Sequence, residues 1–121
     1  MPLNITNTDD YILVEFSKGM DYWGIMAGIS KLFSMPEFKD KNDVWVFKDG
    51  QLKMRYTDLY SIKDSVAKLY PKDSKGKKTA IITETGVQYS LATLYSDIGS
   101  DLPREIRVFP DLKSATDWVK R

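Results

Sequence analysis

The residue types that most often carry chemistry are largely missing from this 121-residue chain, which contains no histidine and no cysteine. The sequence therefore lacks the commonest general base and the usual metal ligands. It can form neither a disulfide nor a thiolate nucleophile. Catalysis would have to use carboxylates, lysines, tyrosines or hydroxyls, and we predict no catalytic residues, no metal site and no cofactor.

One candidate for ligand chemistry is the segment 83–86, where an apolar strand leads through a short turn into a helix. In open α/β sheets, ligands bind beyond the carboxyl ends of the strands, and the N–H groups of a helix N-terminus favour anions. Thr83, Thr85 and Gly86 are therefore candidate residues for binding a small anion or a phosphorylated partner. The preferred alternative is a helix capped by Thr85, because Glu84 disfavours an anion and no Walker-type lysine follows.

Thr57 supplies a second hydroxyl, at the start of a helix that we predict to end before Pro71. A helix N-terminus stabilises an added phosphate, which makes Thr57 a candidate phosphoacceptor or anion-binding residue. The preferred alternative is an ordinary N-cap contributing about 1 kcal/mol, because Asp58 would repel a phosphate.

Aromatic and methionine side chains gather at the start of the first predicted helix, at Met20, Tyr22, Trp23 and Met26. Tyr22 and Trp23 cannot share one narrow helix face. The surplus apolar side chains could line a pocket for an apolar ligand or form a self-association surface. Ordinary packing in the core is the third interpretation.

The charge balance disfavours polyanionic partners, since 18 lysines and arginines face 17 aspartates and glutamates for a net charge of +1. The run from Lys72 to Lys78 is rich in lysine but has no interleaved aromatic ring, whereas nucleic-acid platforms combine both. We predict a solvated loop there and no nucleic-acid partner.

Carboxylates near the ends of predicted elements are the remaining candidates for acid–base work, but no pattern brings two of them together. A carboxylate- or lysine-based enzyme thus stays open as a third functional hypothesis. These carboxylates are Glu15, Asp43, Asp49, Glu84 and Asp101.

The elements that must position these residues can be predicted from periodicity. Residues 3–16 indicate a hairpin, and Val44–Phe47 and Thr79–Thr83 indicate adjacent interior strands covered on both faces. Residues 105–109 alternate as an edge strand does. Leu52–Met54 could form a short extended continuation.

Helix signals lie between the strands. Asp21 and Asp111 are predicted N-caps of the first and last helices, and Pro36 ends the first. A helix beginning near Gly86 should bury Val87, and Gly99 should close it in the left-handed conformation. Its other predicted inward residues are Leu91, Leu94, Tyr95 and Ile98.

Strands alternating with helices predict an α/β fold: a five-stranded mixed sheet with four helices and a leading β-hairpin, forming one domain over residues 1–121. No signal peptide and no apolar run of roughly 20 residues is apparent, so we predict a cytoplasmic protein without a transmembrane segment.

The order of elements resembles the STAS domain, and more specifically the SpoIIAA-like group of small bacterial proteins. The resemblance lies in residues 44–50, 78–83 and 105–112, and in a helix of the form aromatic-x-Leu-Ala-x-x-Tyr at 89–95. The switch serine or threonine of regulatory STAS proteins lies in an Asp-Ser-Ser-Gly-like motif. That motif is absent, and only Thr57 occupies a comparable place.

The resemblance implies a non-enzymatic binding or regulatory module that acts through protein contacts and forms a homodimer. Some relatives are similar to lipid-binding CRAL-TRIO domains, so the alternative hypothesis is a carrier of an apolar, lipid-like small molecule. The cluster of Met20, Tyr22, Trp23 and Met26 would then supply the pocket.

Overall fold

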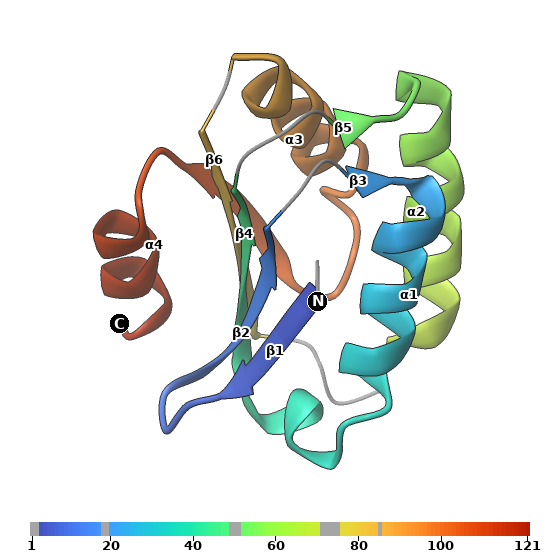
Figure 1. Ribbon diagram of the computed structural model, residues 1–121. Helices are drawn as coiled ribbons and strands as arrows, with labels where there is room; N and C mark the ends of the chain where they lie inside the picture. The colour runs from blue at the N-terminus through green and yellow to red at the C-terminus, as the bar shows by residue number, and fades with distance from the viewer. Residues whose placement is uncertain (1–2, 18–19, 49–51, 71–75, 85) are drawn as a thin grey trace.

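The computed structural model of the chain describes residues 3–17, 20–48, 52–70, 76–84 and 86–121. Its main feature is a five-stranded sheet with a helical layer on one face and one helix on the other (Figure 1). The predicted α/β class, the mixed sheet with four α-helices and the leading hairpin are confirmed.

The main sheet has the order β1-β2-β4-β6-β7. Only β1 is antiparallel, pairing with β2; the other neighbours are parallel. The predicted interior strands are neighbours at the centre, and the predicted edge strand lies at the edge. The bounds are β1 Leu3–Asn7, β2 Tyr11–Phe16, β4 Asn42–Phe47, β6 Lys78–Thr83 and β7 Glu105–Phe109.

Two short strands outside the main sheet, β3 (Met20–Asp21) and β5 (Leu52–Lys53), pair in parallel. The extended segment expected near Leu52 therefore exists, but its partner strand was not predicted. A 3₁₀-helix, η1 (Pro36–Asp40), precedes β4 and was also not predicted.

Three helices form a layer on one face of the sheet, and we call α1, α2 and α3 together the helical layer. The fourth, α4, covers the opposite face (Figure 1). The bounds are α1 Tyr22–Phe33, α2 Tyr56–Leu69, α3 Gly86–Ile98 and α4 Leu112–Val119.

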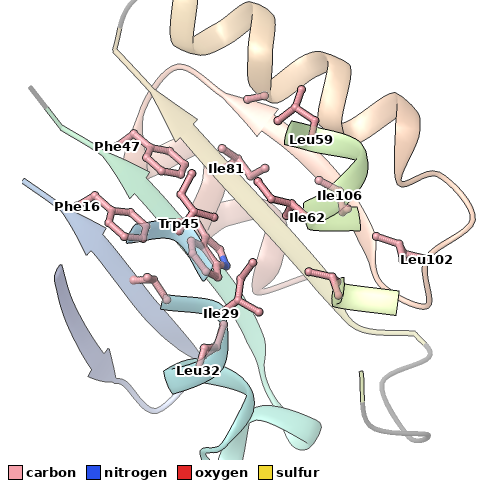
Figure 2. Packing of buried hydrophobic residues seen from close by; sticks show 14 of the residues in the cluster. Phe16, Ile29, Leu32, Trp45, Phe47, Leu59, Ile62, Ile81, Leu102 and Ile106 are labelled. Carbon is pink, nitrogen blue, oxygen red and sulfur yellow. The ribbon is translucent and has the colours of Figure 1, made fainter. Parts of the chain in front are cut away.

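Successive side chains of the interior strands point to opposite faces of the sheet, so the hydrophobic core has two parts, one on each face. Along β4, Trp45 and Phe47 pack in the cluster under the helical layer, whereas Val44 and Val46 pack against α4 with Trp118. Figure 2 shows Trp45 and Phe47 beside other side chains of the first cluster. Both faces of β4 are buried, as its continuous apolar run predicts.

Of the four predicted N-caps, Thr85 lies outside the described residues, and two of the other three are confirmed. Asp21 Oδ1 accepts a hydrogen bond from Gly24 N at 2.9 Å, and Asp111 Oδ1 accepts one from Ser114 N at 2.7 Å. The prediction that Thr57 is the N-cap of α2 is wrong, because α2 begins at Tyr56 and its N-cap is Arg55. The carboxylate of Asp58 accepts from Arg55 N at 3.0 Å and so takes over the capping function.

Two expectations for α3 are wrong. Val87 is 67% exposed, and the buried residue of the first turn is Gln88. Gly99 does not adopt positive φ; a Cβ there would lie 2.9 Å from Leu102 Cδ1 and 3.2 Å from Tyr95 O. Close packing between α3 and the loop before β7, rather than a left-handed turn, therefore accounts for the glycine.

None of the helices within the described ranges combines the length and apolar character that crossing a membrane requires.

Candidate ligand cavity

A cavity of about 80 Å³ lies between the helical layer and the sheet. Its sheet wall is made by one face of the strands, including Trp45, Phe47, Ile81 and Ile106. The helices contribute mainly aliphatic side chains, with α1 supplying Ile25, Ile29 and Phe33. Most of the wall is therefore apolar.

The cavity wall follows β4 along its length, because Asp43, Trp45 and Phe47 all lie on the face toward the helical layer. Four residues of strand span about 13 Å. Phe47 lies at the carboxyl end of the sheet, next to Thr83, and Asp43 lies at the amino end, next to Thr79. The cavity thus has an apolar end and a polar end.

The polar end contains Asp43, whose side chain accepts from three donors. Arg104 Nη1 lies 2.8 Å from Oδ1, Thr79 Oγ1 lies 2.8 Å from Oδ1, and Trp45 Nε1 lies 2.7 Å from Oδ2. Asp43 and Arg104 are only 2% and 1% exposed. An ion pair of this kind is stable in the interior only when further hydrogen bonds satisfy both groups.

The guanidinium of Arg104 has those further partners. It donates to Lys41 O at 2.7 Å and to Phe38 O, and its Cζ lies 3.7 Å from the centre of the Phe38 ring. These contacts join the loop before β7 to η1 and to the start of β4. The pair therefore connects segments that are about sixty residues apart in the chain.

Burial raises the pKa of the Asp43 carboxyl above its ordinary value. The Arg104 charge and the hydrogen bonds from Trp45, Thr79 and Arg104 act in the opposite direction and favour the ionised form. Its oxygens already serve these donors, which leaves Asp43 poorly placed to abstract a proton from a substrate.

Two tyrosines complete the polar end, and we call Asp43, Thr79, Tyr70, Tyr95 and Arg104 the buried polar cluster. Tyr70 follows the last turn of α2 and Tyr95 comes from the last turn of α3, and both line the cavity together with Thr79. Burial first, and then the nearby Asp43 charge, raises the pKa of both phenols well above 10. Both hydroxyls therefore stay neutral donors at physiological pH.

The predicted anion-binding residues lie at the opposite, carboxyl end of the sheet. Thr83 is buried at the end of β6, Gly86 opens α3, and Thr57 is exposed in the first turn of α2. Thr85 lies outside the described residues. The structure therefore places the three described residues at the ends of their elements, and their anion binding stays a prediction.

The surroundings of that end are not favourable to an anion. Gln88 Oε1 accepts from Glu84 N at 2.8 Å, so a protein side chain occupies one of the N–H groups at this helix start. On the α4 side, an open groove is lined by three carboxylates, from Glu15, Glu84 and Asp111, and by Lys48, which pairs with Glu15 at 2.7 Å.

Of the predicted apolar cluster at the start of α1, Tyr22, Trp23 and Met26 do not line the cavity. Trp23 is 75% exposed and lies edge-on to Tyr22, with ring centres 5.0 Å apart. Tyr22 and Met26 pack at the margin of the core, and Met20 belongs to β3. The cavity-lining residues of α1 are instead the next inward positions of the same helix, and a role of the predicted cluster in a pocket or an interface stays a prediction.

Sequence reasoning named Asp43 only as one of five unranked carboxylates, and it missed Arg104, Tyr70 and Tyr95 as a group. A signal exists in the strand repeat, because Asp43 is a polar residue on a face of β4 that otherwise carries Trp45 and Phe47, and Thr79 is its neighbour on β6. No local pattern marks Arg104 as buried. Among the described residues, no three acidic side chains gather closely enough to hold a metal ion.

Comparison with solved structures supports the fold. The chain is similar to an uncharacterised protein of the DUF3478 family with a SpoIIAA-like fold from Shewanella loihica PV-4. The two share 15% identity with a TM-score of 0.54, and the match covers 97% of this chain and 91% of the other. This chain thus has a SpoIIAA-like fold. No protein-family model matches it, and no curated protein does.

The raised tyrosine pKa values predict a loss of stability in alkaline solution. In the unfolded chain Tyr70 and Tyr95 ionise near pH 10, whereas in the folded chain they stay neutral to higher pH. The stabilising contribution is therefore complete below pH 10 and is lost as the pH rises above it. Urea unfolding between pH 8 and pH 12 should show this decline, and the Y70F/Y95F double variant should show a shallower one. An equal decline in both proteins would contradict the assignment.

Proposed function

We propose that this chain is a non-enzymatic binding module whose ligand is an apolar small molecule held between the helical layer and the sheet. The observation that carries the proposal is the cavity, with its mostly apolar wall and a single polar end. Pockets for small molecules have this composition: a hydrophobic lining with a few polar groups that fix orientation.

Contacts with the wall also support a ligand. A molecule that fills the 80 Å³ space gains dispersion contacts with the side chains that line it and stabilises the folded chain by mass action.

The chemistry of the cavity supports binding rather than catalysis. Among the described residues that line it, Asp43 is the one charged side chain, and its oxygens accept from Trp45, Thr79 and Arg104. A general base needs a free oxygen within reach of a substrate proton. The third functional hypothesis, an enzyme based on carboxylates, therefore gains no support from the one buried carboxylate that lines a cavity.

Filling the cavity should abolish ligand binding without harming the fold. Ala92 lines the cavity on α3, and the substitution Ala92→Leu adds three carbon atoms directed at this space. We expect the variant to be as stable as the parent or up to about 2 kcal/mol more stable. We expect its affinity for pentane, followed by the NMR shifts of the Ile81 and Ile106 methyl groups, to fall at least tenfold.

Ala67→Leu is the matched control, because Ala67 is exposed on α2 and does not line the cavity. It should leave pentane binding unchanged. The proposal would be overturned if pentane caused no methyl shifts in the parent protein, or if Ala92→Leu bound pentane as well as Ala67→Leu does.

A second candidate function, self-association through protein contacts, is favoured by exposed aromatic side chains. Trp23, Tyr56 and Tyr60 are 75%, 63% and 53% exposed, and Val87 and Tyr89 are 67% and 53% exposed. All five lie near the N-terminal ends of the three helices of the helical layer. Large exposed apolar side chains that gather at one end of a molecule are typical of an interaction surface.

Sedimentation velocity tests this second candidate. If the aromatic residues form a homodimer surface, the parent chain should sediment as a dimer at micromolar concentration, and Trp23→Ser with Tyr56→Ser should shift it to monomer. Lys113→Ser on α4, which is exposed on the opposite face, is the control and should remain dimeric. A parent chain that is monomeric at every accessible concentration would remove the candidate.

A further inference from the structure

The main sheet ends in β1 on one side and in β7 on the other, and the two edges differ in their protection. An edge strand presents unpaired N–H and C=O groups, and proteins commonly block such edges with charged side chains or covering contacts. β7 has both. Glu105 and Arg107 are exposed along it, and Ser96 Oγ of α3 donates to Ile106 O at 3.1 Å. The β7 edge is therefore poorly suited to another strand.

β1 lies at the opposite edge of the sheet (Figure 1). Its five residues, Leu-Asn-Ile-Thr-Asn, include no charged residue and no proline. β2 is the one described strand that pairs with it. Leu3 and Ile5 are half-buried against the cluster under the helical layer, whereas Asn4 and Thr6 are exposed on the other face. The outer side of β1 is thus an uncharged edge that can accept a further strand.

The hydrogen-bonding direction of β1 follows from the turn that ends it. In an antiparallel pair, alternate residues exchange hydrogen bonds with the partner strand, and the residues between them point their N–H and C=O groups away from it. Thr8 N donates to Tyr11 O at 2.9 Å, so every second residue back from Thr8 is bonded to β2. The backbone groups that point outward, to the free edge, belong to Leu3, Ile5 and Asn7.

A second hydrogen bond, at the other end of β2, agrees with this assignment. Phe16 O accepts from Lys48 N at 2.8 Å, so the backbone groups of Phe16 point away from β1. Leu3 is the partner of Phe16 in the ladder and is therefore not bonded to β2. Its backbone groups point to the free edge.

We propose that β1 pairs with β1 of a second copy of this chain, antiparallel about a twofold axis at Ile5. The outward residues, at positions 3, 5 and 7, are symmetric about Ile5. In this register each outward N–H therefore meets an outward C=O of the other copy, as a self-complementary twofold contact requires. The two main sheets become one continuous sheet.

The side chains fit the same register. The two Ile5 side chains become neighbours on the face of the helical layer, so the pairing extends the apolar cluster from one copy into the other. β1 brings no charge of its own to the contact. Lys41 Nζ, which donates to Asn7 Oδ1 at 2.7 Å, lies at opposite ends of the paired strands in the two copies. No like charges are therefore brought together at the centre.

This pairing uses neither the cavity nor the exposed aromatic side chains, so it goes beyond both proposed functions. One pair of strands buries less area than a standard protein interface. The dimer should therefore form at high protein concentration.

The experiment tests the register by charge, in chains that all carry Trp23→Ser and Tyr56→Ser so that the aromatic surface does not contribute. Sedimentation velocity from about 10 μM to about 1 mM gives the dimer Kd. The register places Asn4 of one copy opposite Thr6 of the other. Asn4→Lys with Thr6→Lys should raise the Kd at least about tenfold, because like charges then oppose each other twice.

Asn4→Lys with Thr6→Glu is the matched control, because it changes the same two exposed positions but places opposite charges across the contact. It should dimerise at least as tightly as the chain with unchanged β1. Circular dichroism of both variants checks that the fold is kept.

Amide hydrogen exchange in the chain with unchanged β1 tests the pairing without relying on these variants. The N–H groups of Ile5 and Asn7 should exchange more slowly at about 1 mM than at about 10 μM, because pairing engages them. Those of Asn4 and Thr6 are bonded to β2 and should exchange equally at both concentrations.

A chain that stays monomeric up to about 1 mM, with exchange at Ile5 independent of concentration, would overturn the inference. So would a dimer whose Kd responds equally to the two charge variants, because the contact would then lie elsewhere or in another register. Neither result bears on the cavity or on its proposed ligand.

Discussion

The buried ion pair between Asp43 and Arg104 is the interaction on which the amino end of this fold depends. Taking both charges out of water costs several kcal/mol per ion, and only the close pairing with its additional hydrogen bonds offsets that cost. Because Arg104 also donates to Lys41 O and Phe38 O, the pair holds the loop before β7 against η1 and the start of β4. The loop before β7 is thereby fixed against a segment that lies about sixty residues earlier in the chain.

The same pair determines the character of the cavity. Asp43 is the first inward-facing residue of β4, and Thr79 is its neighbour on β6, so the polar groups lie at one end of an otherwise apolar wall. Tyr70, which follows the last turn of α2, and Tyr95, in the last turn of α3, also line the cavity. The two ends of the cavity therefore differ: among the described residues of its wall, the polar side chains lie where the strands begin, and apolar side chains lie where the strands end.

Much of the fold could be predicted because its determinants are local. The apolar runs at 44–47 and 79–83 predict interior strands, and alternation at 105–109 predicts an edge strand. Asp21 and Asp111 predict helix starts because a carboxylate at an N-cap acts within three residues. Two local predictions were wrong. The carboxylate of Asp58 caps α2 in place of Thr57. At Gly99 a close tertiary contact, and not a left-handed backbone conformation, accounts for the glycine.

The site could not be predicted, because its members come together only in the tertiary structure. Arg104 stands beside Pro103 in an ordinary polar loop, and arginine is mostly exposed in proteins, so no pattern marks it as buried. The cavity is less predictable still. Helical periodicity indicates which side chains face inward, but not whether opposite faces meet closely enough to fill the space between them.

The most direct test of this account measures the coupling between Asp43 and Arg104 by urea unfolding of Asp43→Ala, Arg104→Met and the double variant. We expect Asp43→Ala to lower the free energy of unfolding by about 3–5 kcal/mol, because it leaves the buried guanidinium without its counter-charge. The loss in the double variant should be at least about 1 kcal/mol smaller than the sum of the single losses. Losses that add within about 0.5 kcal/mol would show that the two residues act independently and would contradict the account.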